Sequence, residues 1–134
     1  MTHDSTSNIS LQSERARKIR DASLIVWDEA PMSPAMQFEV VDRLLKDIMG
    51  SDLPFGGKPI LLGGDSRQIL PVIRRGTRSD IVRQSIIHSH LWNSMQKFCL
   101  TRNIRAEQDN EYADWLLMLG DGRLPVVEGT RDCI

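Results

Sequence analysis

The chain has 134 residues, of which 26% are charged, and its formal net charge at pH 7 is −1. This length suits one domain that buries about two-thirds of the surface of its unfolded chain. The nearly balanced charge excludes a global basic field for nucleic acid, so DNA binding requires a local basic patch. The sequence has no apolar run of membrane-spanning length, and we expect no signal peptide in residues 1–4.

Cysteine and histidine do not suggest a metal site. Cys99 and Cys133 lie far apart and neither belongs to a CxxC pair, so we expect two reduced thiols and no zinc. His3, His88 and His90 lack the spacing of a metal-binding set. His88 and His90 are instead expected to lie at the start of a helix.

The first half of the chain alternates helical and extended patterns. A charged helix is predicted over residues 13–21 and a strand over residues 24–27. Ser33 is a suitable N-cap, and Pro34 a suitable first residue, for a second helix that Gly50 ends. Within this helix an apolar stripe has the spacing i, i+3, i+4, i+7 and is expected to face the core: Val41, Leu44, Leu45 and Ile48.

The second half continues this alternation. A glycine- and proline-rich loop over residues 51–58 precedes a strand over residues 59–62. Four further elements are then predicted: two short helices over 77–87 and 88–96, a third strand over 98–100, and a helix over 109–119 that Gly120 stops. Helices that alternate with short apolar strands are typical of an α/β fold with a parallel sheet. The last residues, 122–134, are expected to be loosely held.

The first strand ends in two adjacent carboxylates. Its apolar run does not alternate, which suggests a strand covered on both faces, as in a parallel sheet whose ligands bind at the carboxyl ends of the strands. At that end Asp28 is suited to hold Mg²⁺, which takes oxygen ligands, and Glu29 to orient and deprotonate an attacking water. Taken alone, the pair is better explained as a solvated strand end at which Asp28 caps the next turn.

The second strand runs into a turn of small and polar residues, GGDSRQ, over residues 63–68. Gly63 and Gly64 permit positive φ and a close approach of the backbone to a ligand. Gln68 carries an uncharged donor and acceptor that can sense a terminal phosphate or an attacking water. Alone this turn is an ordinary strand-to-loop connection, but after an Asp-Glu strand it favours a nucleotide site.

The longest local basic patch consists of four arginines: Arg67, Arg74, Arg75 and Arg78. Arginines of this kind bind the phosphates of nucleic acid through charge. A solvated loop and helix start explains the patch equally well, so both interpretations stay open.

Together these segments resemble the Helitron-type branch of the Pif1-like ATP-dependent DNA helicases, in the broad superfamily of the RecD helicases. The resemblance covers nearly the whole chain in six ordered segments: residues 4–10, 27–32 (WDEAPM), 53–58 (LPFGGK), 64–68 (GDSRQ), 100–105 (LTRNIR) and 115–122. It implies a truncated three-layer α/β core of the RecA-like P-loop NTPase type with a parallel sheet. Residues 1–104 then correspond to the C-terminal part of the first helicase domain, and residues 105–134 to the start of the second motor domain.

The resemblance also implies roles for four residues. Asp28 and Glu29 match the Walker B acids, with Asp28 as the Mg²⁺ ligand and Glu29 as the catalytic base. Gln68 matches the phosphate-sensing glutamine of motif three, and Arg105 the motif-four arginine that reaches the γ-phosphate. All four are expected to bind ATP and to converge at the carboxyl edge of one parallel sheet.

Two features depart from the family pattern. A Gly-Lys-Ser/Thr phosphate loop is expected before the first strand, yet the only Gly-Lys pair, Gly57-Lys58, follows that strand and precedes Pro59 where a hydroxyl is required. This pair is therefore not a P-loop. Ser66 stands where the family usually has an aromatic residue, which affects the packing expected around Gln68.

We therefore expect a fragment of an ATP-dependent five-prime to three-prime DNA helicase. It would use ATP and Mg²⁺ on single-stranded DNA and duplex junctions, in repair, recombination or telomere maintenance, in the nucleus or alternatively in mitochondria, without a membrane partner. Two alternatives stay open: a catalytically inactive DNA- or partner-binding remnant, and a gene fragment left by a transposable element. An in-frame phosphate loop upstream of Met1 would favour the helicase, and a genuine start at Met1 the alternatives.

Overall fold

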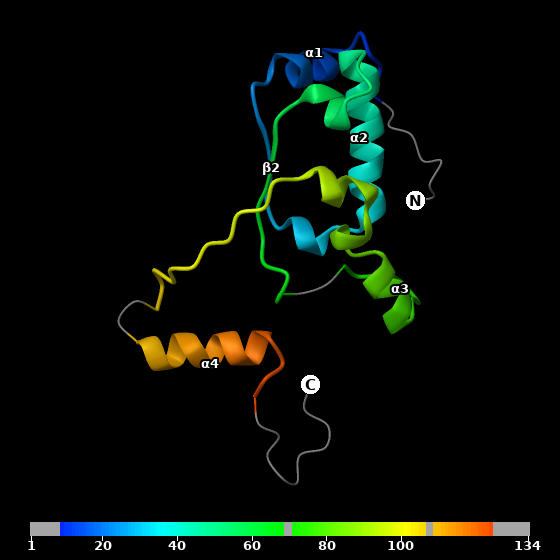
Figure 1. Ribbon diagram of the computed structural model, residues 1–134. Helices are drawn as coiled ribbons and strands as arrows, with labels where there is room; N and C mark the ends of the chain where they lie inside the picture. The colour runs from blue at the N-terminus through cyan, green and yellow to red at the C-terminus, as the bar shows by residue number, and fades with distance from the viewer. Residues whose placement is uncertain (1–8, 69–70, 107–108, 125–134) are drawn as a thin grey trace. The chain divides into compact units, whose positions relative to one another are not determined.

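The structure is a computed structural model that describes residues 9–68, 71–106 and 109–124 (Figure 1). The chain divides into two compact units, one ending at Gln96 and the other beginning at Lys97. The first unit contains the sheet, and the second contains one described helix, α4 (Asn110–Gly120). The boundary expected between residues 104 and 105 concerns the domains of a complete motor and stays a prediction.

The sheet consists of two parallel strands, β1 (Ile25–Trp27) and β2 (Ile60–Leu62). Trp27 pairs with Leu62, so the two strands end at the same level. The pairing continues beyond them because the Gly63 N–H donates a hydrogen bond to the Trp27 carbonyl (2.9 Å). An α/β arrangement with parallel strands is thus confirmed, and each strand begins one residue later than predicted.

One helix, α2 (Ala35–Met49), covers the inner face of the sheet. Phe38 is fully buried, and its ring stacks on Trp27 with the ring centroids 4.3 Å apart. Leu45 and Ile48 are also buried, as the apolar stripe predicts, whereas Val41 and Leu44 are half-buried. Burying one such side chain contributes about 1.5–3 kcal/mol, so this face supplies much of the stability of the first unit.

The other face of the sheet is open in the described residues. Val26 and Leu61 are paired in the register, and they are 62% and 53% exposed. The expectation of a strand covered on both faces is therefore wrong for this part of the chain. An apolar run without alternation indicates that both faces of the strand are apolar, but only the tertiary structure shows which of them is covered.

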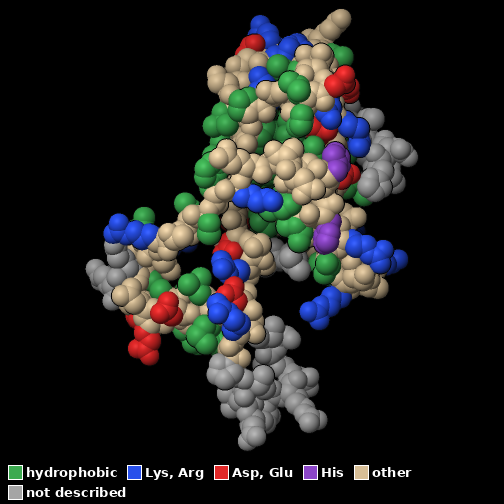
Figure 2. All heavy atoms as spheres, in the orientation of Figure 1, with side chains coloured by type: hydrophobic (Ala, Val, Ile, Leu, Met, Phe, Trp, Pro, Cys, Tyr) green, Lys and Arg blue, Asp and Glu red, His purple; other side chains and the backbone are tan. Residues whose placement is uncertain are grey.

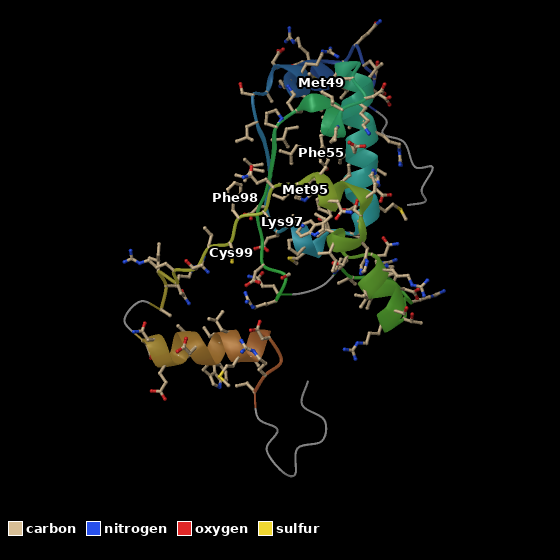
Figure 3. All side chains as sticks on the ribbon, in the orientation of Figure 1. Met49, Phe55, Met95, Lys97, Phe98 and Cys99 are labelled. Atoms are coloured by element: carbon tan, nitrogen blue, oxygen red, sulfur yellow. The ribbon has the colours of Figure 1, made fainter. Side chains whose placement is uncertain are left out.

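A buried carboxylate fixes the loop that follows α2. The 3₁₀ helix η2 (Pro54–Gly57) contains three residues of positive φ, Phe55 (53°), Gly56 (64°) and Gly57 (76°). Asp42, which is only 2% exposed, accepts a hydrogen bond from the Phe55 N–H (2.6 Å) and pairs with Lys46 (2.8 Å). A Cβ at Gly56 would lie 2.4 Å from a carbonyl oxygen of α2, so this approach requires glycine. Figure 3 shows Phe55 between β2 and α2, where it joins the core.

Helix α1 (Glu14–Asp21) precedes the sheet and packs against α2. The Ser13 hydroxyl caps its first turn, as in the predicted helix over 13–21. At the other end the Lys58 ammonium donates hydrogen bonds to the carbonyls of Arg20 and Ala22, both at 2.7 Å. A cation at the C-terminal end of a helix satisfies carbonyls that lack helical partners and opposes the helix dipole.

The segment after the sheet is less helical than predicted. Helix α3 covers only Arg78–Arg83, and the 3₁₀ helices η3 (Ile86–His88) and η4 (His90–Ser94) follow it. The predicted helix over 77–87 is therefore too long. The predicted helix over 88–96 is wrong in type, because this segment is 3₁₀. Ser89 explains one break, because its hydroxyl accepts a hydrogen bond from the Leu91 N–H and its backbone is extended. Such local bonds compete with the helix.

Two smaller predictions are also corrected. The N-cap of α2 is Pro34, not Ser33, and no side-chain hydrogen bond caps this helix. Residues 98–100 are irregular and exposed, so the predicted third strand is wrong. A strand requires a hydrogen-bonded neighbour, and the described sheet contains only β1 and β2.

The second unit contains α4, which confirms the predicted helix over 109–119 to within one residue. Asp109 is its N-cap and accepts a hydrogen bond from the Tyr112 N–H (2.9 Å). None of the described helices is long and apolar enough to cross a membrane.

Replacing Asp42 by alanine should lower the free energy of unfolding by about 2–3 kcal/mol, because the buried Phe55 N–H loses a charged acceptor. Denaturant unfolding followed by circular dichroism measures this loss. Asp47→Ala is the matched control, since Asp47 is exposed on the same helix and the substitution raises the intrinsic helix propensity by the same amount as Asp42→Ala. Equal losses in the two variants would contradict the role given to Asp42.

Candidate functional site

The acidic pair lies at the carboxyl end of β1, beside the glycine turn that follows β2. The Asp28 Oδ1 atom accepts a hydrogen bond from the Glu29 N–H (2.9 Å). A Cβ at Gly63 would lie 3.3 Å from the same oxygen. Asp28 and Glu29 are both exposed, so the two carboxylates are accessible to a ligand at one edge of the parallel sheet.

Glu29 has an unusual backbone conformation. Its φ of 51° and ψ of 37° lie in the left-handed region, which costs a residue with a side chain about 1–3 kcal/mol unless its surroundings hold it there. Two hydrogen bonds fix the segment that follows. The Ala30 N–H donates to the Gly63 carbonyl (2.8 Å), and the Met32 N–H donates to the Glu29 carbonyl (3.0 Å). Glu29 therefore turns the chain sharply from β1 into the 3₁₀ helix η1 (Ala30–Met32).

Gly64 has a φ of 147°, a conformation that side chains disfavour. A Cβ at this position would lie 2.3 Å from Cδ of Pro31, so the proline ring packs directly on the glycine backbone. The prediction of positive φ in the glycine pair is thus confirmed for Gly64. The close contact, however, is with the protein's own Pro31. Sequence analysis missed this contact, although a proline so soon after the acidic pair was a signal of a constrained turn.

Gln68 lies on the segment that leaves the same edge of the sheet. The Asp65 carboxylate accepts a hydrogen bond from the Arg67 N–H (2.9 Å), and the Asp65 carbonyl accepts one from the Gln68 N–H (3.2 Å). Gln68 is exposed, and its approach to the acids stays a prediction. Ser66 is exposed too, so its small side chain costs no buried packing here.

Arg105 belongs to the second unit. The Asn103 side-chain oxygen accepts hydrogen bonds from the N–H groups of Arg105 (3.1 Å) and Ala106 (3.2 Å) and so stabilises the turn that carries the arginine. Arg105 is exposed. Its convergence with Asp28 joins residues of different units and stays a prediction.

The only Gly-Lys pair has a structural role. Lys58 binds the carbonyls at the end of α1, and its own N–H donates to the Phe55 carbonyl (3.1 Å). The lysine is thus engaged away from the edge that carries the acids. This agrees with the conclusion from sequence that the pair is not a phosphate loop.

Three exposed arginines surround the start of α3: Arg74, Arg75 and Arg78. Figure 2 shows basic side chains gathered over this helix. Hydrogen bonds from Thr77, helped by nearby Arg83, hold the pKa of Asp80 below its usual value, so this carboxylate stays charged within the cluster. The fourth member of the predicted patch, Arg67, lies 4.0 Å from the Asp65 carboxylate.

The model of the family described as "PIF1-like helicase" matches residues 1–130 of this chain. The chain belongs to the PIF1-like helicase family. Its relatives include the ATP-dependent DNA helicase PIF1 of Trypanosoma brucei brucei, 31% identical over 121 residues that cover 87% of this chain and 12% of that protein. The ATP-dependent DNA helicase RRM3 of Saccharomyces cerevisiae is 28% identical over 108 residues, which cover 80% of this chain and 15% of that protein.

Solved Pif1 helicases have the same fold over most of this chain. The Bacteroides Pif1 helicase, solved in complex with ADP-AlF3 and ssDNA, matches with a TM-score of 0.74 at 20% identity, over 93% of this chain and 30% of that one. The Candida albicans Pif1 helicase matches with a TM-score of 0.71 at 24% identity, over 82% of this chain and 24% of that one. This PIF1-like chain spans 12–22% of the length of four curated relatives.

A PIF1-like site of this kind offers few protein ligands to a metal ion. Within residues 9–68, 71–106 and 109–124, no three His, Cys, Asp or Glu side chains lie close enough together to hold a metal. Mg²⁺ fits such a site, because it usually keeps several waters and binds through one or two carboxylates together with substrate phosphates. Asp28 would supply the carboxylate.

Proposed function

We propose that this chain carries the acidic half of the ATP site of a PIF1-like DNA helicase. One observation carries the proposal: Asp28 lies beside Gly63, and Glu29 follows it directly, at one exposed edge of a parallel sheet. Ligands of parallel α/β sheets bind at this edge. In a chain of this family, two acids at that edge are best explained as the Walker B pair.

Each residue has a distinct task in this proposal. Asp28 holds Mg²⁺, which would supply charge neutralisation for the phosphate oxygens. A carboxylate oxygen of Glu29 accepts the proton of the attacking water, a role worth about 10²–10⁴-fold in rate. Gln68 hydrogen-bonds the γ-phosphate or the water, and the Arg105 guanidinium stabilises the charge of the same phosphate.

The complete protein would extend this site in the manner of its family. In that protein a further layer would cover the open face of the sheet, at Val26 and Leu61, to give the three-layer RecA-like core. ATP hydrolysis would then drive five-prime to three-prime movement along single-stranded DNA, in repair, recombination or telomere maintenance, in the nucleus. The Bacteroides relative, solved with a nucleotide analogue and ssDNA, supports ATP and single-stranded DNA as ligands. Within the family we assign the chain to the Helitron-type branch, on the resemblance of its sequence motifs.

Binding of single-stranded DNA by this chain itself is a second candidate function. The exposed arginines around α3 favour it, because they follow the glycine turn in sequence and are grouped on one segment. Arginines bind DNA phosphates irrespective of base sequence. This function requires no phosphate loop.

The 134-residue chain alone should show no DNA-stimulated ATPase activity. Positioning and charge stabilisation of the phosphates supply nearly all catalysis in phosphoryl transfer, and the sequence contains no Gly-Lys-Ser/Thr loop for either task. The measurement is phosphate release with and without single-stranded DNA. Turnover that DNA stimulates and Glu29→Gln abolishes would contradict this expectation.

A chimera should recover ATP hydrolysis if the retained residues are competent. The chimera joins this chain to a family-type upstream segment with a phosphate loop and to the downstream motifs of the same relative. Glu29→Gln should then lower kcat by about 10²–10⁴-fold, because the base is lost. Glu14→Gln, at an exposed glutamate of α1, is the control and should leave kcat unchanged.

The same chimera is compared with its Ser66→Phe version, which restores the aromatic residue usual in the family. Because Ser66 is exposed, both versions should be active. Folded chimeras that bind nucleotide but do not hydrolyse it, with either residue at position 66, would contradict the proposed site.

For DNA binding, the double variant Arg74→Gln/Arg78→Gln should weaken binding of a single-stranded oligonucleotide and reduce its salt dependence. Two lost phosphate contacts reduce the magnitude of the negative slope of log K against log salt by roughly 1.4, since each contact contributes about 0.7 for single strands. Fluorescence anisotropy over a salt series measures both effects. Arg15→Gln/Arg17→Gln removes the same charge from the exposed side of α1, and an equal loss there would refute the α3 surface.

A further inference from the structure

The contact between Pro31 and Gly64 has no part in the proposed chemistry, yet it is the tightest approach at the site. Gly64 has a φ of 147°, and a Cβ there would lie 2.3 Å from Cδ and 3.0 Å from Cγ of Pro31. The proline ring therefore fills the space that a side chain at position 64 needs. Gly50 is a useful contrast, because its φ is also positive (62°) but a Cβ there would meet nothing within 4 Å.

This contact lies next to the strained residue Glu29. On one side of Glu29, its own N–H is bound to the Asp28 carboxylate (2.9 Å). On the other side, the Ala30 N–H is bound to the Gly63 carbonyl (2.8 Å), and Pro31 rests on Gly64. Asp28, before Glu29, is therefore held by a hydrogen bond. Ala30 and Pro31, after Glu29, are held by contacts with the turn that follows β2.

We propose that Pro31 and Gly64 are positioning residues that hold Glu29 in its left-handed conformation. This inference rests on the proposed function, in which Glu29 is the base. The pyrrolidine ring fixes the φ of Pro31 near −65° and suits the start of a short helix. With the ring seated on Gly64, the segment that begins at Glu29 cannot rotate without colliding with Gly64 or breaking the Ala30–Gly63 hydrogen bond.

The position of Glu29 matters because a base works only within hydrogen-bond reach of the water that it deprotonates. A displacement of about 1 Å costs on the order of 10²-fold in rate. The contact of Pro31 with Gly64 therefore acts on the rate of the chemical step and leaves nucleotide binding to other residues.

The first test measures the backbone of Glu29 in the 134-residue chain by NMR. The three-bond coupling between its amide and α protons reports φ, and amide exchange of Ala30 reports the bond to Gly63. Pro31→Ala should release Glu29 from its positive φ and speed exchange at Ala30. Pro54→Ala is the matched control, because Pro54 also stands in the first turn of a 3₁₀ helix and is exposed.

This measurement decides the proposal without any activity. If Glu29 keeps its positive φ in Pro31→Ala, or lacks it in the unmodified chain, then Pro31 and Gly64 do not hold it and the proposal fails. A change of equal size in Pro54→Ala would refute it as well.

The second test uses the chimera and separates kcat from KM. Pro31→Ala and Gly64→Ala should each lower kcat by about 10–100-fold and leave KM for ATP unchanged, because they displace the base and not the nucleotide. Gly50→Ala introduces a side chain at positive φ in open space, and kcat should not change.

An active chimera in which Pro31→Ala keeps full kcat would overturn the positioning role. A chimera that is inactive before any substitution would instead refute the proposed function, while the NMR result still decides the positioning of Glu29.

Discussion

The parallel pairing of β1 with β2 is the interaction on which both the core and the site depend. Because Trp27 pairs with Leu62, the acids after β1 come to lie beside the glycines after β2. A slip of one residue would move every side chain of a strand to the opposite face. The half-buried Trp27 would then exchange places with the exposed Val26, and Asp28 would lose its place beside Gly63. The same register thus sets the stability of the unit and the geometry of its carboxylates.

Three residues with side chains have positive φ in the first unit, Glu29, Phe55 and Arg75, and the structure holds Phe55 and Glu29 by different means. Phe55 is buried, and the carboxylate of Asp42 binds its N–H from the middle of α2. Glu29 is exposed, and its neighbours are bound to the turn after β2. The left-handed conformation of Phe55 serves packing, because it places the Phe55 side chain in the core. Glu29 is exposed and takes no part in the core, so its backbone conformation is compatible with the functional role proposed for it.

The four residues proposed for the ATP site do not all belong to one compact unit. The acids and Gln68 belong to the first unit, and Arg105 belongs to the second. Within its own unit Arg105 is exposed, and the Asn103 side chain stabilises the turn that carries it. The role of Arg105 at the γ-phosphate therefore stays a proposal that rests on the resemblance to the family.

The sequence by itself determined the features that depend on local patterns. Helical periodicity and capping residues predict α1, α2 and α4, apolar runs predict β1 and β2, and the ordered motifs identify the family and name Asp28 and Glu29. The tertiary structure alone decided the features that depend on contacts between distant segments. The predicted strand over 98–100 is absent because a strand needs a neighbour that its own sequence does not supply. The left-handed Glu29 and the contact of Pro31 with Gly64 escaped prediction because they arise only where the ends of two paired strands meet, and this juxtaposition is set by the register of the sheet and by no local preference.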